Sequence, residues 1–178
     1  MKKLSEKRCV IIGSSPDTEI SVLTENIKSG DFVVCADGGY IYAQQAKITP
    51  NLIIGDFDSS VFPQDSDCEI IKLPVQKDDT DTLFCVKECL KRGFNNFVIL
   101  GGTGGRFDHT FANIQLISSL SRRGMNAIID ARETSFTSIT NGRILFDETA
   151  KGTISVFSHS DISSGVTISG LKYELKNG

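Results

Sequence analysis

Short apolar runs alternate with amphipathic segments along the first 130 or so of the 178 residues. This alternation is typical of strand and helix units that build a parallel sheet. We expect strands at residues 9–13, 32–36, 52–55, 69–73, 96–101 and 126–130, and helices at residues 17–29, 39–46, 81–92 and 107–123. The fold class predicted for residues 1–131 is therefore an N-terminal parallel-sheet α/β domain.

The pattern changes after Arg132 to stretches of period two that are rich in Thr, Ser, Val and Ile. Turns are marked by Asn141-Gly142, Lys151-Gly152 and Ser164-Gly165, and such spacing favours antiparallel strands joined by hairpins. Residues 132–178 are thus predicted to form a smaller C-terminal all-β, sandwich-like domain. A sheet of that size has little core, so we expect it to pack on the first domain or on another subunit.

Composition narrows the classes of function. The formal net charge of -3 argues against a nucleic-acid-binding protein, which needs a surplus of basic residues to replace counterions. The apolar runs are too short to span a bilayer, and charges follow Met1 where a signal peptide needs apolar residues. We expect a cytoplasmic protein that binds no membrane, with its five cysteines reduced and mostly buried.

Four polar segments follow predicted strands directly, at residues 36–39, 55–59, 77–81 and 101–109. In an open parallel sheet, ligands bind outside the carboxyl ends of the strands. Segments that are distant in the sequence are therefore expected to meet at one edge of the sheet.

Asp56 and Asp58 are separated by one residue on an extended stretch, so both side chains point to the same side, roughly 6–7 Å apart. Two carboxylates at that spacing can bracket Mg²⁺, which prefers oxygen ligands and joins them to substrate phosphates. The alternative is a turn in which Ser59 caps a short helix.

Asp81 begins a predicted helix, with Asp78 and Thr80 just before it. Carboxylates at a helix start are favoured by the helix dipole, so capping accounts for part of this segment without a ligand. Lys77 does not fit that explanation, because a cation is disfavoured there, and a lysine facing phosphate is the alternative.

Glycines fill four of the five positions from 101 to 105, namely Gly101, Gly102, Gly104 and Gly105. Their backbone can approach a ligand closely, adopt positive φ and present N–H groups as an anion nest, which suits a triphosphate. The loop matches neither the P-loop nor the dinucleotide fingerprint, because Arg106 and Phe107 stand where those motifs need other residues. A plain glycine-rich turn remains the alternative.

The residues after the glycines add charge. Arg106 can bind phosphate oxygens in a bidentate way, and Asp108 can orient Arg106, bind a nucleotide hydroxyl or cap the helix. His109 is interpreted as a hydrogen-bonding or capping group in preference to a general base. Residues 13–16, after the first strand, fit either a ligand contact or a simple turn, and His159 is given no role.

The ordered motifs resemble those of the thiamine pyrophosphokinase family. The resemblance rests on residues 37–39, 55–59, 77–81 and 101–109 with Asn113 after them, and extends to Gly170-Leu171-Lys172-Tyr173. It implies an α/β domain followed by a β-sandwich-like domain, in a homodimer with active sites between subunits. It also implies the reaction, in which ATP and thiamine give AMP and thiamine diphosphate with Mg²⁺ as cofactor.

The resemblance also implies roles for individual residues. The metal-binding and catalytic carboxylates would be Asp56, Asp58 and Asp81, and Ser59 would face either substrate, thiamine or ATP. As a hypothesis, Tyr173 offers an aromatic face to the cationic thiazolium of thiamine and so binds this substrate. The nucleotide site would comprise Asp37, Gly38, Gly39, Lys77, Asp78, Thr80, Gly101, Gly102, Gly104, Gly105, Arg106, Asp108, His109 and Asn113. Family members continue past the Gly-Leu-Lys-aromatic element, so we expect the β domain of residues 132–178 to be incomplete relative to the family.

Two other functions use the same residue types. A metal-dependent phosphatase or phosphoesterase would release phosphate without an alcohol acceptor, and the large glycine loop would then be oversized. A non-catalytic ATP-sensing module would bind ATP and form no AMP.

Overall fold

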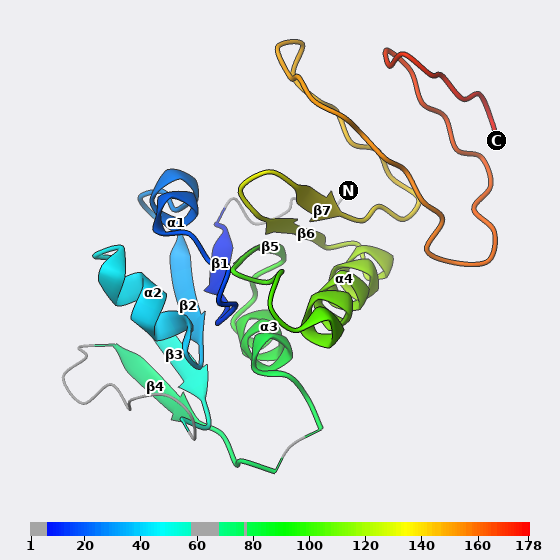
Figure 1. The fold of residues 1–178 in the computed structure, drawn as a ribbon. Helices are drawn as coiled ribbons and strands as arrows, with labels where there is room; N and C mark the ends of the chain where they lie inside the picture. The colour runs from blue at the N-terminus through cyan, green and yellow to red at the C-terminus, as the bar shows by residue number, and fades with distance from the viewer. Residues whose placement is uncertain (1–6, 58–67, 77) are drawn as a thin grey trace. The chain divides into compact units, whose positions relative to one another are not determined.

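The computed structural model describes residues 7–57, 68–76 and 78–178, and its contacts divide the chain into two units, Met1–Gly142 and Arg143–Gly178. Within the described residues the first unit is built on a seven-stranded sheet in the order β4-β3-β2-β1-β5-β6-β7 (Figure 1). The strands are β1 Cys9–Ile12, β2 Phe32–Ala36, β3 Leu52–Gly55, β4 Glu69–Lys72, β5 Asn96–Leu100, β6 Asn126–Asp130 and β7 Ser135–Thr137.

The strands β1 to β6 pair in parallel, which confirms the predicted α/β sheet. The helices are α1 Ile20–Asn26, α2 Gly39–Gln45, α3 Asp81–Lys91 and α4 Phe107–Arg122. The helix expected at residues 17–29 is shorter, because a turn at Ser15–Thr18 comes first. There the Thr18 backbone N–H and Oγ1 both donate to the Ser15 carbonyl, at 3.1 and 2.6 Å.

The sheet is covered on both faces, by α1 and α2 on one side and by α3 and α4 on the other (Figure 1). Side chains of β1 alternate between the two cores, with Cys9 and Ile11 facing α3 and α4, and Val10 and Ile12 facing α1 and α2. All four are fully buried. Because a strand buried on both faces has no polar side, its sequence reads as one apolar run.

Helix α3 has the start and end that its sequence predicts. The Thr80 side chain accepts a hydrogen bond from the Leu83 N–H at 3.3 Å, which caps the helix, and Asp81 lies in the first turn. Gly93, with φ of 86°, follows the last turn in the left-handed conformation typical of a helix end. The cap fixes where Asp81 lies at the edge of the sheet.

The five cysteines are free thiols, as predicted, and four of them are buried, with Cys68 partly exposed. The Sγ atoms of Cys9 and Cys89 lie 3.2 Å apart between β1 and α3. Among the described residues, no helix has the length and apolar character needed to cross a membrane.

Residues 143–178 form no regular helix or strand, and one isolated antiparallel bridge joins Ile168 and Leu175. Backbone hydrogen bonds between Val166 and Gly178 extend this pairing. The hairpins expected there are thus formed only in part. Large apolar side chains such as Leu145 and Phe157, 82% and 85% exposed, leave the unit with little core of its own.

The division between the units lies after Gly142, later than the boundary expected after residue 131. The reason is β7, which pairs antiparallel with β6 and so belongs to the first unit. A hydrogen bond of 3.1 Å between Ser121 and Thr140 holds the following residues to α4.

Candidate active site

The strand order reverses between β1 and β5, and this point determines where a ligand can enter. From β1 the chain builds outward through β2, β3 and β4, and then crosses back to place β5 on the other side of β1. Such a switch point leaves a crevice at the carboxyl ends of the two strands. The Gly13 N–H donates to the Leu100 carbonyl at 2.7 Å and the Ser15 N–H to the Gly101 carbonyl at 3.3 Å, so the two loops are joined.

A hollow of about 180 Å³ lies at this switch point. Its walls come from the loop after β1, the start of α3, the glycine loop and the first turns of α4. The lining residues are Gly13, Ser14, Ser15, Pro16, Thr82, Gly101, Gly102, Gly104, Arg106, His109 and Asn113.

The loop after β1 contributes more than its sequence indicates. Residues 13–16 fit a ligand contact and a simple turn equally well from sequence, and the structure places all four in the wall of the hollow. Thr82 is a further lining residue that the motifs do not reveal. The available signal for residues 13–16 is their position directly after the central strand of the sheet.

The glycine loop needs residues without a Cβ atom. Gly101 and Gly104 have φ of 63° and 90°, and a Cβ at either would overlap a neighbouring side chain, that of Thr18 at Gly101 and of Asp17 at Gly104. The loop is therefore packed against the segment that follows β1.

Two N–H groups of the loop are already engaged by side chains. The Gly104 N–H donates to Thr110 Oγ1 at 3.1 Å, and the Gly105 N–H donates to Asp17 Oδ2 at 2.9 Å. The expectation that glycines 101–105 present their N–H groups as a nest is therefore wrong for these two. They fix the shape of the loop, and Gly105 is not part of the wall of the hollow.

Arg106 and Asp108 form a bidentate ion pair at the start of α4. Arg106 Nη2 lies 2.5 Å and Nε 3.1 Å from the two oxygens of Asp108, and both side chains are exposed. The hydrogen bond from Arg106 lowers the pKa of Asp108, so the carboxylate stays ionised. Among the roles considered for Asp108, the structure favours the one that orients Arg106.

His109 and Asn113 lie one helical turn apart on α4 and both line the hollow. Asn113 is buried, and its side-chain N–H donates to the Gly102 carbonyl at 2.8 Å. Asn113 therefore supports the glycine loop from below, and His109 is the exposed neighbour that faces the space.

Asp37, which follows β2, lies against the end of β3. The Asp37 N–H donates to the Ile54 carbonyl at 2.8 Å, and the side chain of Asp37 lies against Gly55, just before Asp56. Gly38 and Gly39 begin α2, where a Cβ on Gly39 would overlap the Ile12 carbonyl. Close packing of α2 on the end of β1 thus accounts for Gly39.

Three of the expected site residues, Asp58, Ser59 and Lys77, lie outside the described residues. Among the residues that are described, no group of three or more His, Cys, Asp or Glu side chains is arranged to hold a metal ion. The set of Asp56, Asp58 and Asp81 therefore remains a prediction. Near it, Asp79 forms an ion pair with Lys87, while Asp78 precedes the cap of α3.

Tyr173 belongs to the second unit. Its side chain is 78% exposed, and the Lys172 ammonium lies 5.4 Å from the centre of its ring. The ring thus already has a cation–π contact with Lys172, and a contact of Tyr173 with thiamine stays a prediction.

Comparisons with known proteins point to one family. Residues 23–129 match the family model described as "Thiamin pyrophosphokinase, catalytic domain". Thiamin pyrophosphokinase 1 of Caenorhabditis elegans is 31% identical over 186 residues, which cover 95% of this chain and 74% of the relative.

Solved structures show the same fold. The thiamine pyrophosphokinase from Bacillus subtilis is 24% identical, with a TM-score of 0.83 over 97% of this chain and 83% of its own. A thiamin pyrophosphokinase family protein from Enterococcus faecalis is 29% identical, with a TM-score of 0.56 over 74% of this chain and 63% of its own. The likeness to the first structure extends over both units.

Proposed function

This chain belongs to the thiamin pyrophosphokinase family, and on that premise we propose that its sheet edge, with bound Mg²⁺, transfers the pyrophosphoryl group of ATP to thiamine. Family membership makes the chain an enzyme, a thiamine diphosphokinase that uses ATP as co-substrate in thiamine diphosphate biosynthesis. The comparisons give no support to a phosphatase or to an ATP-sensing module.

The hollow at the switch point is the observation that carries the assignment of an ATP site. It is lined by glycines 101, 102 and 104, whose lack of side chains leaves room for phosphate, and by Arg106, whose guanidinium suits an anionic chain of phosphates. His109 adds a further hydrogen-bonding group. We assign the phosphates of ATP to this hollow.

Carboxylates that follow β3 and begin α3 suit Mg²⁺. Asp56 follows β3 and Asp81 begins α3, and helix α3 contacts β3. These carboxylates, with Asp58, are hard donors of the kind that Mg²⁺ selects. The ion would neutralise charge on the β- and γ-phosphates.

The reaction needs positioning more than covalent help from the protein. The hydroxyl oxygen of thiamine forms a bond to the β-phosphorus as the bond from that phosphorus to the bridging oxygen of the α-phosphate breaks, and AMP leaves. Arg106 donates from Nε and Nη2 to Asp108, and its remaining N–H donors would bind phosphate oxygens. The hydroxyl proton passes to a base or to water.

Exposed apolar residues of the second unit support a homodimer. Leu145, Phe146, Phe157 and Ile162 are each at least 60% exposed, and such side chains are stabilised when a second subunit covers them. Sedimentation velocity of the wild-type chain tests this proposal: a dimer is expected, and a monomer at micromolar concentration would contradict it.

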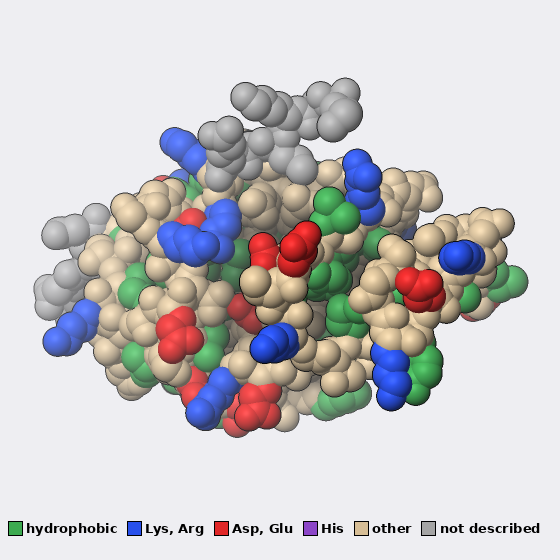
Figure 2. All heavy atoms as spheres, turned by 90° about the horizontal axis from the view of Figure 1, so that it is seen from above, with side chains coloured by type: hydrophobic (Ala, Val, Ile, Leu, Met, Phe, Trp, Pro, Cys, Tyr) green, Lys and Arg blue, Asp and Glu red, His purple; other side chains and the backbone are tan. Residues whose placement is uncertain are grey.

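A cytoplasmic location and independence from nucleic acid and membranes complete the proposal. Five free cysteines favour a reducing compartment. On the face in Figure 2, the blue Lys and Arg side chains are interspersed with red Asp and Glu side chains, without the basic patch that nucleic acid requires.

Product analysis tests the function. The chain is incubated with ATP and thiamine, with MgCl₂ or with EDTA, and the nucleotides and thiamine esters are separated. AMP and thiamine diphosphate are expected, in equal amounts and only with Mg²⁺. ADP with thiamine monophosphate would overturn the proposed transfer, and full turnover in EDTA would overturn the role of the metal.

A further inference from the structure

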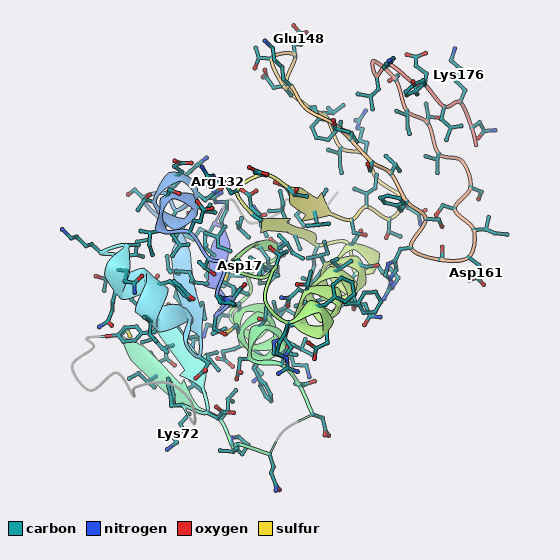
Figure 3. All side chains as sticks on the ribbon, in the orientation of Figure 1. Asp17, Lys72, Arg132, Glu148, Asp161 and Lys176 are labelled. Carbon is teal, nitrogen blue, oxygen red and sulfur yellow. The ribbon has the colours of Figure 1, made fainter. Side chains whose placement is uncertain are left out.

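The structure assigns to Asp17 the role of a positioning residue, which holds the glycine loop in the shape that binds the phosphates of ATP. This inference rests on the proposed function of the hollow. Asp17 lies in the turn between β1 and α1, and its Oδ2 accepts a hydrogen bond of 2.9 Å from the Gly105 N–H. Figure 3 labels Asp17 beside the loop that leads from β5 into α4.

Both glycines next to this hydrogen bond, Gly104 and Gly105, pack closely on residues 16 and 17. A Cβ on Gly104 would overlap Asp17 Oδ2, and a Cβ on Gly105 would lie 2.7 Å from Cδ of Pro16. The backbone of both glycines therefore lies directly on residues 16 and 17. Gly104 and Gly105 have positive φ, a conformation that residues with a Cβ rarely adopt, so glycine at both positions allows these contacts.

Asp17 acts from outside the hollow. Gly104 and Arg106 line the space, whereas Gly105 and Asp17 do not. The carboxylate consequently does not occupy the volume assigned to phosphate. It fixes the residue between two lining residues, and through it the direction in which Arg106 enters α4.

The turn that carries Asp17 is itself held in place. The Asp17 N–H donates to Ser15 Oγ at 3.3 Å, and Thr18 Oγ1 donates to the Ser15 carbonyl at 2.6 Å. These bonds alone fit a local turn, which any small polar residue at position 17 would satisfy. The bond to Gly105, 88 positions away in the sequence, is the one that a local turn does not require.

The steady-state test compares Asp17→Ala with Asp17→Asn. The amide oxygen of Asn can accept the same hydrogen bond, whereas Ala cannot. We expect Asp17→Ala to raise KM for ATP about tenfold, as for loss of one net hydrogen bond, with KM for thiamine unchanged and the melting temperature lowered by about 2–4 °C at most. Asp17→Asn is expected to restore KM for ATP to near the wild-type value.

Glu19→Ala is the matched control. Glu19 is an acidic residue of the same segment, but it pairs with Arg132 at 3.1 Å and not with the glycine loop. It is expected to leave KM for ATP unchanged. An unchanged KM for ATP in Asp17→Ala would overturn the inference, as would an equal rise of both KM values with a lowered melting temperature.

Hydrogen exchange of the ligand-free chain separates this inference from the proposed function. The Gly105 amide is expected to exchange faster in Asp17→Ala than in the wild type or in Asp17→Asn. Equal exchange of the Gly105 amide in the wild type and in both variants would overturn the positioning role of Asp17, even if the enzyme is active. If the Gly105 amide exchanges faster in Asp17→Ala but the wild-type chain makes no AMP, Asp17 still positions the loop and the proposed function alone is overturned.

Discussion

The carboxylate of Asp37 lies against Gly55, so that a Cβ built on residue 55 would stand 2.8 Å from Asp37 Oδ1. Asp37 has φ of 44°, and its N–H donates to the carbonyl of Ile54. The ends of β2 and β3 are thereby joined, and Asp56 is the first residue after β3. The positions of two site aspartates depend on this one contact.

Gly55→Ala is expected to displace Asp37 and Asp56 together. Forcing a methyl group into this contact should cost about 1–3 kcal/mol in the free energy of unfolding, and activity should fall because the carboxylates shift. Urea unfolding and turnover measure the two effects. Gly142→Ala is the control, because the nearest atom to its Cβ is the Thr140 carbonyl oxygen at 3.7 Å. Wild-type turnover in Gly55→Ala would contradict the importance of this contact.

Asp56→Asn is expected to lower kcat/KM by roughly a hundredfold or more, because the amide is a poor ligand for Mg²⁺. The circular dichroism spectrum should be unchanged. Asp161→Asn, which makes the same change in the second unit, is the control and should retain full activity. Turnover of Asp56→Asn at the wild-type rate and wild-type Mg²⁺ concentration would exclude Asp56 as a metal ligand.

Asp31 is expected to account for part of the loss of stability in acid. Burial alone would raise the pKa of Asp31, but hydrogen bonds from Arg8 and from the Lys28 N–H, with the charge of Arg8, lower it. The folded state therefore binds this proton less tightly than the unfolded state, whose pKa is about 3.9. The contribution is present above that value and is lost as the pH falls through the folded pKa.

Asp31→Asn tests this expectation. The variant should be less stable than the wild type at pH 7 by about 1–3 kcal/mol, since the Asp31 side chain is only 7% exposed and pairs with Arg8. The difference should shrink as the pH is lowered. A difference that is constant from pH 7 to pH 3, in urea unfolding, would contradict the assignment to this carboxylate.

The buried cysteines are expected to account for part of the loss of stability at alkaline pH. Burial raises the pKa of Cys35 and Cys85, so in the folded state both stay protonated where the unfolded chain ionises, above a pH of about 8.5. Stability should therefore fall as the pH rises through that value.

In the native state a thiol reagent should react first with Cys68, and Cys68→Ser should remove the fast phase. Fast reaction of a second thiol would contradict the burial.

The sequence predicts the sheet and the polar segments at the carboxyl ends of its strands, because both depend on local patterns. Strands buried on two faces read as apolar runs, and the polar segments after β2, β3 and β5 lie where strands end. The hollow could not be predicted in the same way. The bond between Asp17 and Gly105 joins residues that are 88 positions apart in the sequence, so the engagement of the Gly105 N–H has no local signal. Residues 13–16 follow the central strand, but from sequence that position fits a simple turn equally well.

The second unit shows a different limit of sequence patterns. Alternating apolar residues predict paired strands at 132–178, and the structure pairs β7 with the first unit and residues 166–168 with residues 175–178. The period-two alternation predicts which side chains share one face of a strand, but it does not predict what covers that face. Exposed side chains such as Phe157 and Ile162 require that covering.

The fate of the two terminal phosphorus atoms of ATP tests the central claim most directly. The enzyme is given thiamine, Mg²⁺ and ATP that is radiolabelled at either the β- or the γ-phosphorus, and the thiamine product is isolated. Transfer of a pyrophosphoryl group predicts that both labels appear in thiamine diphosphate in equal yield and that AMP is unlabelled. Label from the γ-phosphorus alone, with the β-label retained in ADP, would contradict the account.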